Sequence, residues 1–158
     1  ILKRKKNIFL NCQINANSRG SHSILKYKGV ESLIINETEL RYEMRDSITY
    51  IEKLVKVFSK KYKINNVIVT KGQSGVLMYR NKINKLIKVP GIANNVIDKV
   101  GTGDIMLSII SLFFAVGKKD EISLIAGSMF GAKTLEKYGN ENVVEAQELN
   151  KFFSTFLR

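Results

Sequence analysis

The most informative part of the sequence is Asp98-Lys99-Val100-Gly101-Thr102-Gly103-Asp104, which joins a polar loop to a strongly apolar segment with helical spacing. Its two glycines let the backbone approach a ligand closely. The N–H groups of residues 101–103 can point in one direction at the start of the helix, where the helix dipole is positive. The stretch therefore predicts an anion-binding turn that opens a helix over about 103–116.

An acidic residue, Asp104, follows this predicted turn directly. If its only neighbour were a phosphate, the two negative charges would repel each other. A carboxylate placed beside a phosphoryl group in transfer can instead accept the proton of the attacking hydroxyl. An aspartate that only caps the helix is the common alternative. From the residues alone, Asp104 is a candidate general base or a cap.

Elsewhere, short apolar runs alternate with helical patterns, which is typical of an α/β domain with a mostly parallel sheet flanked by helices. The predicted strands are 8–10, 32–35 and 67–70, followed by a hairpin of 76–79 and 83–89. The predicted helices are 48–58, capped by Asp46 or Ser47, then 103–116, 120–137 and 145–156. Without a repeat or linker in the sequence, we expect one domain over 1–158.

The composition favours a water-soluble globular protein, with 44% hydrophobic and 25% charged residues among 158. The longest apolar run, 105–116, is shorter than the roughly 20 residues that span a bilayer, so we expect no membrane partner. One cysteine and one histidine make neither a disulfide framework nor a zinc site, so we interpret Cys12 and His22 as structural residues. A reducing cytoplasm is the simplest location.

The net charge of +12, from 26 Lys and Arg against 14 Asp and Glu, would attract polyanions. The basic residues are scattered over 3–6, 60–63, 82–88 and 118–119, without the interleaved aromatic residues that stack on bases. We therefore expect no nucleic-acid partner. A non-catalytic basic module that binds nucleic acid or a protein remains the alternative to an enzyme.

Two further polar motifs follow predicted strands. Asn36-Glu37-Thr38-Glu39 comes directly after the strand 32–35, where it is also typical of a helix N-cap with an acidic first turn. Thr70-Lys71-Gly72-Gln73-Ser74-Gly75 leads from the strand 67–70 into the hairpin, and glycine-rich turns are ordinary there. Neither motif alone would indicate a function.

Taken together and in this order, the three motifs resemble those of the ribokinase-like, or PfkB, carbohydrate kinases. The signatures of that family are N-x-x-E, T-x-G-x-x-G and D-T-x-G-A-G-D. Lys99 stands where the family usually has threonine and Thr102 where it usually has alanine, while the glycines and both aspartates are kept. Three motifs in register are more specific than any one of them. The resemblance implies the C-terminal portion of a three-layer ribokinase-like α/β fold.

The resemblance also implies an activity, the ATP-dependent phosphorylation of a sugar or sugar-phosphate hydroxyl. Asp104 would be the general base, and the amides of Gly101, Thr102 and Gly103 would form the anion hole. Mg²⁺ would be held through water by Asn36 and Glu39, and K⁺ by Asp98 and the carbonyl of Val100. The residues implied to bind ATP are Asn36, Glu39, Thr70, Gly72, Gly75, Ala126, Gly131 and Gly139. For Ala126 and Gly131, close helix packing is the equal alternative.

Residues 11–15 and 35–41 narrow the resemblance to the heptose-7-phosphate kinase branch, which includes the kinase domain of ADP-heptose synthase. A kinase of another small hydroxylated molecule, of the hydroxymethylpyrimidine or pyridoxal type, is the alternative on the same fold. The chain corresponds to the ATP-binding half of such a kinase, without the N-terminal sugar-binding half and its lid. A homodimer is compatible with this resemblance. The sequence leaves open whether the chain is active without the N-terminal half, and whether a further domain follows Arg158.

Overall fold

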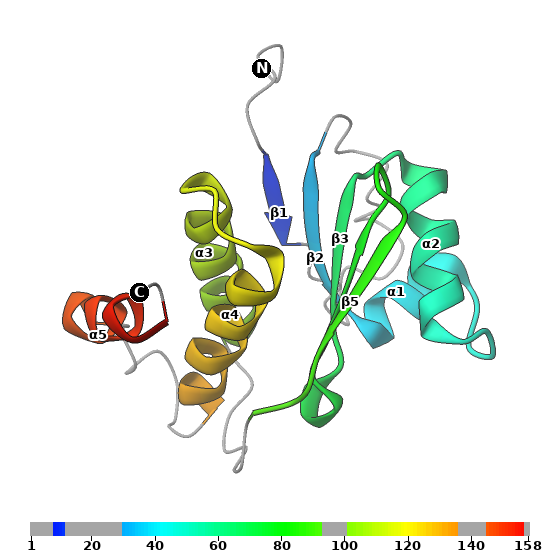
Figure 1. Ribbon diagram of the computed structural model, residues 1–158. Coiled ribbons are helices and arrows are strands. Elements are labelled where there is room, and N and C mark those ends of the chain that lie inside the picture. Colours follow the sequence, from blue (N-terminus) through cyan, green and yellow to red (C-terminus); the bar gives the residue numbers. More distant parts are fainter. Residues whose placement is uncertain (1–7, 12–29, 93–100, 136–144, 157–158) are drawn as a thin grey trace. The chain divides into compact units, whose positions relative to one another are not determined.

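The computed structural model describes residues 8–11, 30–92, 101–135 and 145–156. The chain divides into two compact units, Ile1–Pro90 and Gly91–Arg158, and each is described by itself. The first unit contains β1 (Phe9–Asn11), β2 (Ser32–Asn36), α1 (Glu37–Met44), α2 (Ile51–Tyr62), β3 (Asn66–Thr70), a 3₁₀ turn (Gly72–Ser74), β4 (Val76–Arg80) and β5 (Lys85–Val89). The second contains α3 (Thr102–Ala115), α4 (Asp120–Leu135) and α5 (Ala146–Phe156), all shown in Figure 1.

The strands of the first unit form one sheet in the order β1-β2-β3-β4-β5. β1 pairs with β2 and β2 with β3 in parallel, whereas β3–β4 and β4–β5 are antiparallel. The sheet is thus mixed rather than mostly parallel, because tight turns connect its last three strands and reverse the chain each time. The predicted strands and the hairpin are confirmed, with β5 beginning at Lys85 rather than at residue 83.

The core of the first unit lies between its sheet and its helices. Leu33 and Val67, on one face of β2 and β3, pack in a single hydrophobic cluster with Leu40 of α1 and with Leu54 and Phe58 of α2. Side chains alternate between the faces of a strand, so the neighbours of these strand residues point the other way. Among the residues of the central strands that point to that second face, Ile34, Ile68 and Met78 are buried as well. Burial on both faces explains why these strands read as continuous apolar runs.

The start of α2 differs from the prediction. The helix begins at Ile51, and its N-cap, Tyr50, makes no side-chain cap hydrogen bond. Asp46 acts earlier, in the preceding turn, where its carboxylate accepts the N–H groups of Ile48 (3.0 Å) and Thr49 (2.8 Å). The hydrogen bonds from Thr49 and Ile48 hold the pKa of Asp46 below its ordinary value. The prediction that Asp46 or Ser47 caps a helix over 48–58 was therefore wrong. Ile48 lies before the helix, and its side chain is 92% exposed rather than packed in the core.

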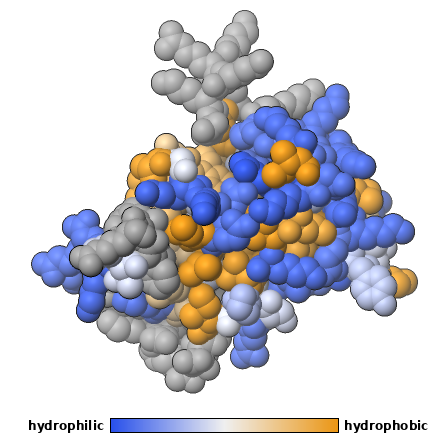
Figure 2. Space-filling view, viewed as in Figure 1, coloured by the Kyte–Doolittle hydropathy of each residue, from blue (hydrophilic) through white to orange (hydrophobic). Residues whose placement is uncertain are grey.

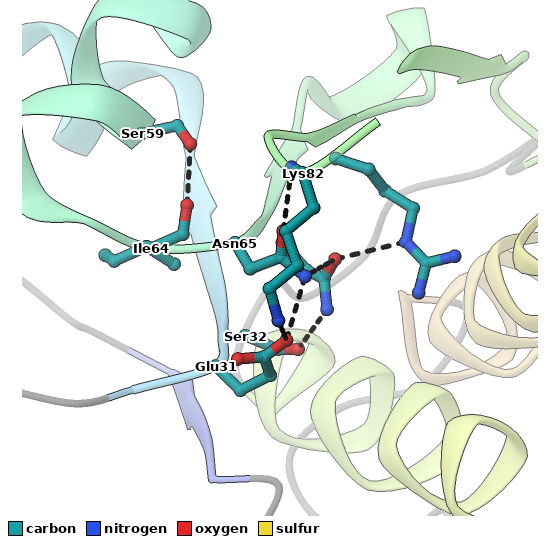
Figure 3. Close-up of polar contacts among 8 residues, drawn as sticks. Glu31, Ser32, Ser59, Ile64, Asn65 and Lys82 are labelled. Carbon is teal, nitrogen blue, oxygen red and sulfur yellow. Dashed lines mark hydrogen bonds and ion pairs between the residues drawn. The ribbon is translucent and has the colours of Figure 1, made fainter. Parts of the chain in front are cut away.

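Polar side chains connect the amino ends of β2 and β3 to the hairpin turn, as Figure 3 shows. The carboxylate of Glu31 accepts the side-chain amide of Asn65 at 2.8 Å and pairs with the ammonium group of Lys82 at 3.1 Å. The side chain of Asn66 donates to Ser32 Oγ at 3.0 Å and accepts from Arg80 Nε at 3.2 Å. Because these groups satisfy one another, their contacts stabilise this end of the sheet.

The surface of the first unit carries several exposed hydrophobic side chains. Tyr42, Ile48 and Tyr50 are 51%, 92% and 84% exposed. On the right of Figure 2, where α1 and α2 lie in Figure 1, hydrophobic residues form small groups among hydrophilic ones. Within the part of the chain that the structure describes, no helix is both long enough and apolar enough to cross a membrane.

In the second unit, α3 and α4 pack closely because α4 carries glycines where the two helices meet. A Cβ atom added to Gly127 would lie 2.5 Å from Cγ1 of Ile110, and one added to Gly131 would lie 2.8 Å from Cγ of Met106. Beside these contacts, Phe113 of α3 is buried against Phe130 of α4. Glycine at these two positions is therefore needed for the helices to approach each other.

Gly127→Ala should lower the free energy of unfolding by about 1–3 kcal/mol, because the new methyl group would overpack the contact with the buried Ile110. Glycine-to-alanine changes in a helix normally stabilise a protein by about 0.5–1 kcal/mol, so the sign of the effect tests the packing. Urea denaturation of both chains measures the difference. A more stable variant would contradict this account of the α3–α4 interface.

Candidate functional site

Two of the predicted motifs meet at one edge of the sheet. In the parallel pairing of β2 with β3, the register partner of Asn36 is Thr70. Both are the last residues of their strands, so N-x-x-E and T-x-G-x-x-G begin side by side at the carboxyl ends of β2 and β3. In open α/β sheets, ligands bind outside the carboxyl ends of the strands. This edge is therefore the candidate ligand site of the first unit.

Asn36 and Glu39 form a complete capping box at the start of α1. The side-chain oxygen of Asn36 accepts the backbone N–H of Glu39 at 2.8 Å, and Glu39 Oε2 accepts the backbone N–H of Asn36 at 3.1 Å. The structure thus confirms that this motif caps a helix. An amide oxygen and a carboxylate keep further lone pairs, so capping and Mg²⁺ binding are compatible.

The donor types of this pair fit Mg²⁺, which prefers oxygen ligands, retains several waters and commonly uses one or two carboxylates together with substrate phosphates. Asn36 is exposed and Glu39 half-buried, so water can reach both side chains. Among the described residues, no group of three or more His, Cys, Asp or Glu side chains is placed to hold a metal ion. The role of Asn36 and Glu39 as metal ligands stays a prediction.

The turn after β3 is built on two glycines with positive φ. Gly72 has φ +56° and Gly75 has φ +85°, and glycine adopts such angles without the steric cost that a Cβ atom adds. The N–H of Lys71 donates to the carbonyl of Gly75 at 2.8 Å, and the N–H of Gly75 donates to that of Gly72 at 3.0 Å. A Cβ atom on Gly72 would meet no described atom within 4 Å, so this side of the turn is open.

The charge of Lys71, in this turn, acts on one ion pair of the first unit. Glu52 of α2 pairs with Lys88 of β5 at 2.7 Å. The hydrogen bond from Lys88 holds the pKa of Glu52 below its ordinary value, and the positive charge of Lys71 adds a smaller effect in the same direction. Lys71 thus acts electrostatically on a carboxylate of its own unit.

In the second unit, the residue at the N-cap position of α3 supplies no capping side chain. Its N-cap is Gly101, which has φ +80° and no side chain to accept a hydrogen bond. The carbonyl of Gly101 accepts the N–H groups of Asp104 and Ile105, both at 3.1 Å. The N–H groups of Thr102 and Gly103 precede these bonds and have no acceptor within an ideal helix. This geometry is compatible with the predicted anion-binding turn.

Asp104 lies in the first turn of α3 and is exposed. It is not the N-cap, because Gly101 holds that position, so Asp104 does not cap the helix from the place where a capping aspartate usually stands. Its backbone carbonyl accepts the hydroxyl of Ser108 at 2.8 Å. An exposed carboxylate close after the uncapped turn is suitably placed for proton transfer.

The side chain of Thr102 is directed toward α4. Its hydroxyl lies 3.2 Å from that of Thr134, and its methyl group would lie 3.3 Å from a Cβ atom on Gly131. The threonine that replaces the usual alanine thus lies against α4, while its N–H stays at the start of the helix. Sequence reasoning missed Thr134, because its partner is 32 residues away along the chain.

The helix-packing alternative accounts for the small residues of α4. Ala126 is fully buried in a cluster with Ile109, Phe113 and Phe130, and Gly131 faces Met106 and Thr102. Their contact with ATP stays a prediction. Other predicted or discussed residues lie outside the described residues, namely Asp98, Val100, Gly139, Cys12 and His22.

The described elements are those of an α/β protein with two glycine-rich turns, one at a strand end and one at a helix start. Residues 2–147 match the pfkB family carbohydrate kinase. Because the match spans most of the sequence, this chain belongs to the pfkB carbohydrate kinase family. No curated protein matches the chain at significant similarity.

Solved structures of ribokinase-like proteins share the fold. Ribokinase from Thermotoga maritima is 19% identical with a TM-score of 0.75, and the match covers 96% of this chain and 50% of that one. A mutant of Escherichia coli phosphofructokinase-2 is 19% identical with a TM-score of 0.71, covering 96% and 48%. Arabidopsis thaliana ribokinase, complexed with ribose and ATP, is 22% identical with a TM-score of 0.68, covering 79% and 41%. The ribokinase-like α/β fold is thereby confirmed, and the chain spans about half the length of these proteins.

Replacing Asn36 by alanine should lower the free energy of unfolding by about 1 kcal/mol, because the N–H of Glu39 loses its acceptor. Asn36→Asp should keep most of the stability, since aspartate caps equally well. Thermal or urea denaturation of both variants measures the effect. Equal stability of the alanine variant and the wild type would show that the capping box contributes nothing.

Proposed function

We propose that this chain is the ATP-binding, catalytic half of a kinase that phosphorylates a hydroxyl of a sugar or sugar phosphate. The observation that carries the proposal is the uncapped Gly101 turn followed by an exposed Asp104, in a member of the pfkB carbohydrate kinase family. A helix start whose first N–H groups have no acceptor within the helix favours an anion, and a carboxylate beside it serves proton transfer rather than anion binding.

Two sets of residues would bind the nucleotide and its metal ion. At the edge of the sheet, Thr70 and the open side of Gly72 would line the nucleotide, and Asn36 with Glu39 would hold Mg²⁺ through water. At the start of α3, the N–H groups of Thr102 and Gly103 would face the terminal phosphate. Bound Mg²⁺-ATP would supply the phosphoryl group that is transferred. Asp98 and the carbonyl of Val100 would hold K⁺.

Asp104 would act on the acceptor. Its carboxylate would accept a hydrogen bond from the attacking hydroxyl and then take its proton. In phosphoryl transfer through a loose transition state, catalysis is mostly positioning and electrostatic stabilisation, so where this carboxylate lies matters more than its strength as a base. The N–H groups of Thr102 and Gly103 would meanwhile stabilise the negative charge that develops on the transferred group.

For the acceptor we propose a heptose phosphate or a similar sugar phosphate. The support comes from the sequence of residues 11–15 and 35–41, which resembles the heptose-7-phosphate kinase branch. A solved E. coli phosphofructokinase-2 in complex with substrates and products shares the fold at 20% identity and a TM-score of 0.67. Incubation of the chain with Mg²⁺-ATP and a panel of sugars and sugar phosphates would identify the acceptor.

Calorimetric titration with Mg²⁺-ATP at physiological salt should give saturable binding to the wild type, and Gly103→Glu should abolish it. The glutamate would fill the anion-binding turn and repel the phosphate. Ser108→Glu adds the same charge farther along α3, on an exposed position, and should leave most of the affinity. If the folded wild-type chain binds polyanions with a steep salt dependence but shows no preference for ATP, the basic-module alternative holds instead.

Asp104→Asn should retain ATP affinity within about twofold and lower the rate of acceptor phosphorylation roughly 10²- to 10⁴-fold, as expected for loss of a general base. Asp120→Asn is the matched control, because Asp120 lies in the first turn of α4 as Asp104 does in α3. A coupled enzyme assay of ADP release measures the phosphorylation rates of the two variants. An Asp104→Asn chain with wild-type turnover would remove this residue from the mechanism.

A further inference from the structure

A pair of hydroxyl groups connects the start of α3 to the end of α4. Thr134 is buried, with 4% of its surface exposed, and its Oγ1 donates to the carbonyl of Gly131 at 2.7 Å. The same Oγ1 lies 3.2 Å from Oγ1 of Thr102. A hydroxyl has a single proton, and that of Thr134 is used on Gly131. The hydroxyl of Thr102 must therefore donate to Thr134, which fixes the direction of this short chain of hydrogen bonds.

Two contacts hold the side chain of Thr102 in this position. Its hydroxyl is bound to Thr134, and its methyl group lies over Gly131, where a Cβ atom would come within 3.3 Å of it. A β-branched side chain has few rotamers, so fixing both branches also restrains its backbone. Thr102 is the first residue of α3, directly after the Gly101 turn. Restraining Thr102 thus restrains the N–H groups of the proposed anion-binding turn.

We propose that Thr134 is a positioning residue, which acts through the hydroxyl of Thr102 to keep the Thr102 and Gly103 N–H groups directed at the terminal phosphate of the nucleotide. The inference rests on the proposed function. Thr102 stands where the family motif usually has alanine, and Thr134 supplies the acceptor that the additional hydroxyl needs. A polar group at a packed interface is costly unless it is hydrogen-bonded, so the two threonines form one unit.

The test compares the affinities for Mg²⁺-ATP and Mg²⁺-ADP, since only ATP carries the terminal phosphate. In calorimetric titrations, Thr134→Val should weaken ATP binding about threefold to tenfold, the effect of one disturbed hydrogen bond, and leave ADP binding within about twofold. Thr134→Ser keeps the hydroxyl and should restore the wild-type ratio of the two affinities. Ser123→Ala removes another buried hydroxyl of α4, one that donates to the carbonyl of Lys119 in the preceding turn, and should change neither affinity.

Thr102→Val removes the same hydrogen bond by changing its half-buried partner. This variant replaces Thr134→Val in the test if Thr134→Val does not fold. It should reproduce the selective loss of ATP affinity, and the double variant should lose no more than either single variant. Equal losses for ATP and ADP, or additive losses in the double variant, would overturn the positioning role and leave helix packing as the role of Thr134. A folded wild type that binds neither nucleotide would instead refute the proposed function, and the positioning role with it.

Discussion

The register of the parallel pair β2–β3 is the constraint on which the first unit depends. It places Leu33 opposite Val67 in the core and Asn36 opposite Thr70 at the edge. A shift of one residue would turn the buried apolar set of one strand to the opposite face. The same pairing that buries the core therefore brings the capping box of α1 beside the glycine turn after β3. Two motifs that are far apart in the sequence become one candidate site through strand pairing alone.

The strands and the hydrophobic helices could be predicted because their signals are local. The apolar runs of β2 and β3 and the long segment of α3 show their type within a few residues. The start of α2 could not be predicted in this way, since Ile48 falls on the helical spacing by coincidence. What decides it is the carboxylate of Asp46, which accepts two N–H groups of a turn and keeps Ile48 and Thr49 out of the helix. Short polar side chains often compete with helix formation in this manner.

In the candidate site, too, the features with a local sequence signal could be predicted and those that depend on helix packing could not. Its glycines and acidic residues follow from the sequence because the backbone turns are local, and Gly72, Gly75 and Gly101 all have positive φ. The roles of Gly131 and Thr134 depend on how α4 packs against α3, which no local pattern encodes. The nearest signal was Thr102 itself, since a hydroxyl in place of a methyl group at a helix start needs a partner. Naming that partner requires the structure.

The starts of α1 and α3 solve the same physical problem differently. The first N–H groups of any helix need acceptors. In α1 the side chains of Asn36 and Glu39 supply them, and such a cap is worth about 1 kcal/mol. In α3 the N-cap is glycine, which begins a helix nearly as well but has no side chain that could accept these N–H groups. An external anion would supply the missing acceptor, and in our proposal the Thr102–Thr134 hydrogen bond restrains the turn that would bind this anion.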